Sequence, residues 1–88
     1  MITKDVTLIN KLGLHIRPAA QFTKIASQYA ASVFLSKDGI RINAKSIMGV
    51  MMLAANRGAV LKIECDGPDE QELMDKLVEL IENKFYED

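Results

Sequence analysis

The chain has 88 residues, a length that accommodates one hydrophobic core, so we expect residues 1–88 to form a single domain. Hydrophobic residues make up 49% of the chain and charged residues 26%, the balance of a folded domain rather than of a disordered or membrane protein. The formal net charge of −1 argues against a nucleic-acid binder or a protein that attaches to anionic membranes. With neither a signal sequence nor a membrane span in view, we expect a cytoplasmic location.

Metal-binding and redox chemistry are disfavoured by the residue counts. The chain has one cysteine, Cys65, and one histidine, His15, so it lacks the partners for an internal disulfide and the clustered ligands of a zinc site. We therefore expect no metal and no cofactor. Cys65 lies on the apolar side of an alternating segment, which predicts a small buried side chain without a function.

The first half of the chain predicts a strand, a helix and a hairpin. Apolar and polar residues alternate from Ile2 to Ile9, a pattern typical of a strand. Apolar residues then recur at helical spacing, and Pro18 in the first turn sets the predicted start of the helix at about Ile16 or Arg17. Two short β-prone runs, at 33–36 and 40–44, flank an Asp-Gly pair that predicts a tight turn.

The second half predicts a short helix, a strand and a longer helix. Ser46 is a favourable N-cap for a helix whose apolar residues start at Ile47. The alternation at 61–66 predicts a strand with one apolar face. Asp69 and Glu72 have the spacing of a capping box ahead of the last helix. The apolar stripe of that helix comprises Leu73, Leu77, Leu80, Ile81 and Phe85.

The resulting order is β-α-β-β-α-β-α. Strands with one apolar face need helices on that face only, and the two longer helices carry apolar stripes suited to covering it. The sequence therefore predicts an α+β fold, an open-faced β-sandwich with a four-stranded antiparallel sheet covered on one face by helices.

His15 stands where a turn becomes a helix, and this position favours phosphoryl chemistry. The free N–H groups and the positive end of a helix bind anions, and the same field favours the neutral, nucleophilic form of the ring. Arg17 can offer a planar set of donors to phosphoryl oxygens. The alternative is a histidine that only caps the helix beside a solvated arginine.

The segment Gly13–Ala20 closely resembles the phosphorylation-site signature of the HPr family, the histidine-containing phosphocarriers of bacterial phosphotransferase systems. A second block, Lys45–Met51, resembles the regulatory-serine segment of the same family. The order of predicted elements is also that of the family, so the resemblance spans the whole chain.

The resemblance implies a role for several residues. His15 matches the histidine that is phosphorylated on Nδ1 by phosphorylated enzyme I, and from which an enzyme IIA component takes the phosphoryl group. Arg17 matches the arginine that assists transfer. Pro18 matches the proline at the helix start, and Gly13 matches the glycine of the preceding turn. Ser46 matches the family's regulatory serine, which an HPr kinase/phosphorylase modifies, whereas from its residue type alone Ser46 is a helix cap.

The short helix that follows Ser46 carries more apolar side chains than one buried face can hold, so we expect Met48 and Met52 to point outward. Flexible methionines suit a surface that accepts several partners. With Ile16 and Ala20 they would form an apolar docking surface around His15, while Ile47 and Met51, its other candidate residues, are expected to lie mostly in the core.

Other functions stay open at this point. A paralogue of the nitrogen-related branch, NPr, is the alternative within the family. An RNA-binding module would need a basic face or stacking aromatics, and a hydrolase would need a nucleophile paired with a base. We expect a monomer that neither binds nucleic acid nor inserts into a membrane. The acidic residues near the end are expected to form a solvated face and tail, to which no role is assigned: Glu79, Glu82, Glu87 and Asp88.

Overall fold

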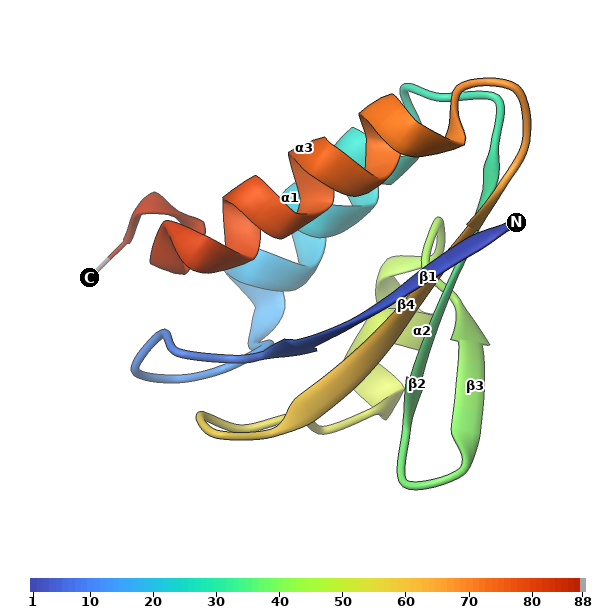
Figure 1. Ribbon diagram of the computed structural model, residues 1–88. Coiled ribbons are helices and arrows are strands. Elements are labelled where there is room, and N and C mark those ends of the chain that lie inside the picture. The colour runs from blue at the N-terminus through green and yellow to red at the C-terminus, as the bar shows by residue number, and fades with distance from the viewer. Residues whose placement is uncertain (88) are drawn as a thin grey trace.

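The computed structural model describes residues 1–87 and contains four strands and three helices in the predicted order (Figure 1). Their bounds are β1 Ile2–Thr7, α1 Ile16–Ala26, β2 Ser32–Lys37, β3 Ile40–Asn43, α2 Ile47–Met52, β4 Val60–Asp66 and α3 Glu70–Glu82. A single turn, η1 Lys84–Tyr86, follows α3. In residues 1–87 no helix is long and apolar enough to cross a membrane.

The strands form one antiparallel sheet in the order β1-β4-β2-β3. The last strand in sequence lies inside the sheet, where β4 pairs with β1 from Ile2↔Cys65 to Thr7↔Val60 and with β2 on its other side. The hairpin between β2 and β3 turns at Asp38 and Gly39, whose φ angles of 51° and 83° are both positive, as a tight two-residue turn requires. The predicted α+β open-faced fold is confirmed.

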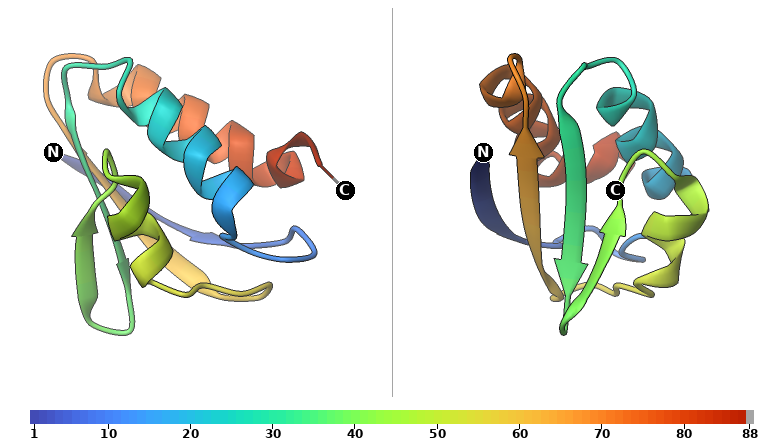
Figure 2. Two further views of the ribbon diagram at one scale, coloured as in Figure 1. Left: turned by 180° about the vertical axis from the view of Figure 1, so that it is seen from behind. Right: turned by 90° about the vertical axis from the view of Figure 1, so that its right-hand side faces the viewer.

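Helices α1 and α3 lie side by side across one face of the sheet and leave the other face open (Figures 1 and 2). The alternation in β4 turns Leu61, Ile63 and Cys65 toward these helices, and all three are fully buried. Burial raises the pKa of Cys65 to about 11, so its thiol stays protonated and unreactive. The largest other side chains of this core are Leu8, Phe22, Leu35, Leu73, Leu77 and Phe85.

The apolar face of α2 is narrower than predicted. Val50 in the helix and Leu53 just after it are buried, but Ile47 and Met51 are each 41% exposed. The expectation that these two side chains lie mostly in the core was therefore wrong. The reason is geometric. Helix α2 has only six residues, fewer than two helical turns, so only one or two of its side chains can face the core.

Asp69 caps a different segment from the one predicted. Its carboxylate accepts hydrogen bonds at 2.9 Å from the N–H groups of both Ala30 and Ala31, and these bonds lower the pKa of Asp69. Within α3 the side chain makes no cap hydrogen bond, so the expected capping box with Glu72 does not form. Instead Glu70 accepts a hydrogen bond from the N–H of Gly67 at 3.0 Å. Asp69 thus ties the start of α3 to the loop between α1 and β2.

The chain departs furthest from prediction after α3. Lys84, Phe85 and Tyr86 have φ angles of 54°, 55° and 57°, so three consecutive residues other than glycine adopt the left-handed conformation. Phe85 was predicted on the helical stripe, yet it lies beyond the helix in this turn and is fully buried. The turn reverses the chain toward the start of α1, and the expected solvated tail is wrong for Glu87. Asp88 lies outside the described residues.

Candidate functional site

His15 occupies the N-cap position of α1, where φ is −77° and ψ is −174°. Its carbonyl accepts the hydrogen bond from the N–H of Ala19 at 3.0 Å, the first bond of the helical ladder. The ring makes no capping bond. Ile16 and Arg17 supply N–H groups that have no acceptor within the helix, and Pro18, which is buried in this first turn, has no N–H to leave unpaired.

The turn before His15 is held by its backbone. Gly13 has a φ of 67°, and a Cβ atom at this position would lie 2.4 Å from the carbonyl oxygen of Ala55. The next N–H group, of Leu14, donates to that same oxygen at 2.9 Å. Asn10, which is fully buried, donates from Nδ2 to the carbonyl of Gly13 at 2.8 Å. The start of α1 is therefore fixed against the loop that follows α2.

Glu87 is the residue of the site that the sequence did not reveal. Its Oε1 atom lies 2.9 Å from Nε2 of His15 and accepts a hydrogen bond from Nδ2 of Asn10 at 3.1 Å. The side chain is only 13% exposed, against 33% for His15. The sequence signal for this contact is Phe85, a large apolar residue two positions before Glu87. Burial of Phe85 in the core places the following residues close to the body of the domain.

The environment of Glu87 favours its charged form. The hydrogen bond with His15 contributes most to lowering the pKa of this carboxyl group, and the bond from Asn10 and the positive charge of Arg17 act in the same direction. Partial burial opposes them but does not prevail. Glu87 is thus a carboxylate at neutral pH and can only accept hydrogen bonds.

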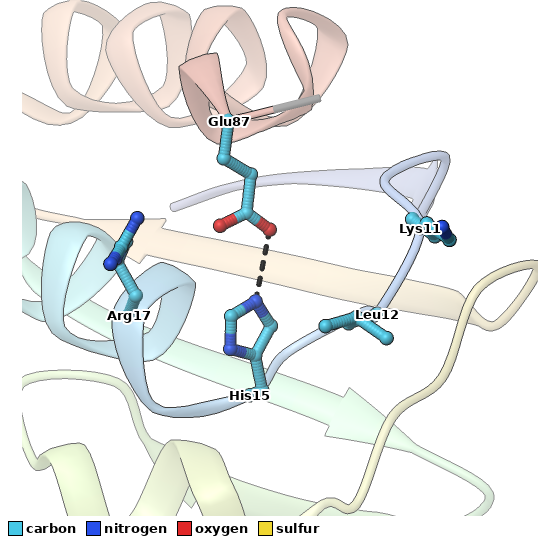
Figure 3. Close-up of a pocket in the computed structure, with 5 residues that line it drawn as sticks. All are labelled: Lys11, Leu12, His15, Arg17 and Glu87. Carbon is cyan, nitrogen blue, oxygen red and sulfur yellow. Dashed lines mark hydrogen bonds and ion pairs between the residues drawn. The ribbon is translucent and has the colours of Figure 1, made fainter.

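These groups line an open hollow of about 300 Å³, formed by Lys11, Leu12, His15, Arg17 and Glu87 (Figure 3). His15 and Glu87 face each other across it, and the Arg17 side chain stands beside them. Within residues 1–87 no group of histidine, cysteine and acidic side chains could hold a metal ion. A nucleophilic ring nitrogen next to free backbone N–H groups and a guanidinium can accept and stabilise a phosphoryl group.

Ser46 is exposed at the start of α2, and its Oγ atom accepts a hydrogen bond from the N–H of Gly49 at 3.2 Å. The predicted cap is therefore confirmed. Two hydrogen bonds tie the chain just before Ser46 to α1 and to the loop after it: Thr23 Oγ1 in α1 donates to the carbonyl of Ala44 at 3.2 Å, and Lys45 Nζ donates to the carbonyl of Tyr29, beyond the helix, at 2.8 Å. Helix α2 packs against α1, and the loop that follows α2 is joined to the turn before His15 by the hydrogen bond from the N–H of Leu14 to the carbonyl of Ala55.

The candidate docking residues are exposed apolar side chains on these two helices. Met48 and Met52 are 77% and 72% exposed, which confirms that they point outward. Ile16 beside the histidine is 65% exposed, and Ala20 is half-buried. Leu12, on the rim of the hollow, adds another exposed apolar side chain at 63%.

Comparison with known proteins places the chain among phosphocarriers. Residues 2–83 match the family described as the PTS HPr component phosphorylation site, where PTS is the phosphotransferase system. The phosphocarrier protein HPr of Cupriavidus necator is 53% identical over 99% of this chain and 98% of its own. The crystal structure of HPr-C-His from Thermoanaerobacter tengcongensis, 44% identical, superposes with a TM-score of 0.96 over 100% of this chain and 99% of that chain.

Dimers occur among the solved relatives. One is an HPr dimer from T. tengcongensis, 46% identical with a TM-score of 0.78 over 91% of this chain and 92% of that chain. Another is Crh of Bacillus subtilis, 42% identical with a TM-score of 0.76 over 96% of this chain and 97% of that chain, a dimer formed by swapping. The monomer expected for this chain is therefore not common to all its relatives. These proteins give no support to the NPr alternative.

The close approach at Gly13 predicts a large cost for a side chain there. Gly13→Ala should lower the free energy of unfolding by about 3 kcal/mol, because it adds a left-handed alanine and a clash with the carbonyl of Ala55. Gly39→Ala is the matched control: its φ is also positive, but no atom lies within 4 Å of the added Cβ, so about 1 kcal/mol is expected. Urea unfolding measures both, and equal losses would contradict the role of the close approach.

Proposed function

The chain belongs to the HPr family of phosphocarriers of the phosphotransferase system, and we propose that Nδ1 of His15 accepts a phosphoryl group from enzyme I and passes it to an enzyme IIA component. It is a carrier rather than an enzyme. The observation that supports this role most directly is the position of His15 at the N-cap of α1, beside the free N–H groups of Ile16 and Arg17. We place the exchange in the cytoplasm, in sugar uptake, with the chain acting as a monomer.

Each neighbour of His15 has a physical task in this proposal. The N–H groups of the first turn face the negative oxygens of the phosphoryl group, which reduces the charge that must be balanced during transfer. Arg17 supplies a further set of donors from the side of the hollow. The hollow is open, so a partner can bring its own reacting group to the ring. Phosphoryl transfer depends mainly on positioning and electrostatics, and the partner can supply what this small site lacks.

We also propose that the partners dock on the apolar surface formed by Ile16, Ala20, Ile47, Met48, Met51 and Met52. Exposed methionines adapt to different partners because their side chains are flexible and polarizable. The loop that follows α2 is tied to the turn before α1, since the N–H of Leu14 donates to the carbonyl of Ala55, and this connection supports a surface beside the histidine. Both the donor and the acceptor can then use one face in turn.

Ser46 is the proposed regulatory site, modified by an HPr kinase/phosphorylase. Its hydroxyl is exposed, and the helix it caps begins the segment that carries Met48 and Met52. A phosphate adds close to two negative charges there without entering the core. A partner with an acidic docking face would then be repelled.

The first prediction concerns the phosphorylated residue. Incubation with enzyme I and phosphoenolpyruvate should attach one acid-labile phosphate per chain, and His15→Ala should abolish it because no other histidine exists in the sequence. Ser46→Ala, the control, should be phosphorylated like the wild type. If the wild type takes up no phosphate, the carrier role fails.

The docking surface can be tested by adding a charge to it. Met48→Asp should raise the KM for enzyme I about tenfold, because a buried carboxylate would be desolvated at the interface. Ile40→Asp places the same charge on an apolar residue of the hairpin that is 54% exposed, and its KM should not change. Steady-state phosphorylation kinetics distinguish the two, and equal KM values would remove Met48 from the interface.

Regulation at Ser46 predicts a charge effect. Ser46→Asp should slow transfer from enzyme I about fivefold at low ionic strength, and added salt should reduce this difference because it screens the repulsion. Ser46→Asn introduces a side chain of nearly the same shape as aspartate but without its charge, and it retains a capping oxygen. Its transfer rate should therefore stay at the wild-type value. Identical rates for the Asp and Asn variants would argue against electrostatic control.

A further inference from the structure

The contact between Glu87 and the ring of His15 bears on which ring nitrogen is nucleophilic. We propose that Glu87 is a positioning residue that holds the proton of the neutral ring on Nε2 and so leaves the lone pair of Nδ1 free for the phosphoryl group. This inference rests on the proposed function for the choice of Nδ1 as the phosphorylated atom. The placement of the proton on Nε2 follows from the contact itself.

The direction of the hydrogen bond is fixed by its partners. Glu87 is a carboxylate with a lowered pKa, so Oε1 accepts and Nε2 must donate over the 2.9 Å between them. The Nδ2 atom of Asn10 donates to the same carboxylate oxygen and to the carbonyl oxygen of Gly13. Because both partners are acceptors, the amide nitrogen of Asn10 rather than its oxygen must face them. A neutral imidazole carries one proton, so a proton on Nε2 leaves none on Nδ1.

The fold holds the carboxylate firmly in place. Phe85 is fully buried, and the N–H groups of Tyr86 and Glu87 donate to the carbonyls of Asn83 and Lys84 at 2.8 and 3.2 Å. The hydroxyl of Tyr86 also donates to Glu79 at 3.3 Å. Three consecutive left-handed residues are costly, and such strain persists only where surrounding contacts enforce it. The contacts that hold this left-handed turn also place Glu87 next to His15.

The ring geometry suits this division of roles. Nδ1 is the nitrogen adjacent to Cγ and lies on the side of the ring away from Glu87, while Nε2 faces the Glu87 carboxylate (Figure 3). During transfer the Nδ1 lone pair forms the bond to phosphorus as the donor's bond to phosphorus breaks, and that electron pair stays on the donor. The proton on Nε2 does not move. The ring gains positive charge, which the Glu87 carboxylate stabilises as the aspartate of a catalytic triad does for its histidine.

The test reads the tautomer directly and needs no phosphoryl donor. With one histidine in the chain, ¹H–¹⁵N correlation spectra at a pH where the ring is neutral give a single pair of ring nitrogens. The wild type should show the proton almost entirely on Nε2. Glu87→Ala should shift the ring toward a mixture of both tautomers. Glu87→Gln should keep the wild-type tautomer, because the donor Nδ2 of Asn10 holds the amide oxygen of the glutamine at the place where it also accepts from Nε2. Glu82→Ala, on an exposed residue of α3, is the control.

Transfer rates from enzyme I complete the test. Glu87→Ala should slow phosphorylation about tenfold, Glu87→Gln should slow it less, and Glu82→Ala should leave it unchanged. A wild-type tautomer in Glu87→Ala would overturn the inference even if that variant were phosphorylated normally. Failure of the wild type to accept phosphate at all would instead overturn the proposed function and leave the tautomer result standing.

Discussion

The site depends on one close backbone contact, between Gly13 and the carbonyl of Ala55. That contact has no room for a side chain, and it joins the turn that presents His15 to the loop that ends α2. The histidine is consequently set at the N-terminus of α1, and the exposed apolar residues of α2 are held beside it. The proposed phosphoryl acceptor and the proposed docking surface are thus joined through this contact, although they come from separate elements of the chain.

The open-faced sheet explains how so small a chain can leave apolar side chains exposed without losing its core. All three helices lie on the same side of the sheet, so one core serves the whole molecule and its strands need only one apolar face each (Figure 2). The short α2 contributes little to that core beyond Val50, and most of its apolar side chains stay exposed. Their exposure supports the proposed docking surface, because exposed apolar side chains add little to stability.

Local signals predicted most of the fold. Pro18, Ser46 and the Asp38-Gly39 pair act within a few residues of where they stand, and each of them marks an element boundary that the structure confirms. His15 and Arg17 stood out for the same reason, because their chemistry depends on a local helix start. Apart from Ile47 and Met51 on the short α2, the misplaced residues have distant partners: Asp69 caps a loop 38 and 39 residues away, and Glu87 meets a histidine 72 residues away. No local pattern reports such contacts.

The left-handed turn at 84–86 has a practical consequence for work on this protein. Because the turn brings the side chain of Glu87 into the lining of the hollow, 2.9 Å from the ring of His15, a probe attached at Glu87 itself would lie beside the histidine. A fluorophore or a crosslinker coupled at that position would disturb the proposed phosphorylation site. Met1 lies at the opposite end of β1, where its amino group pairs with Asp66 and Glu70, so attachments at that end stay clear of the chemistry (Figure 1).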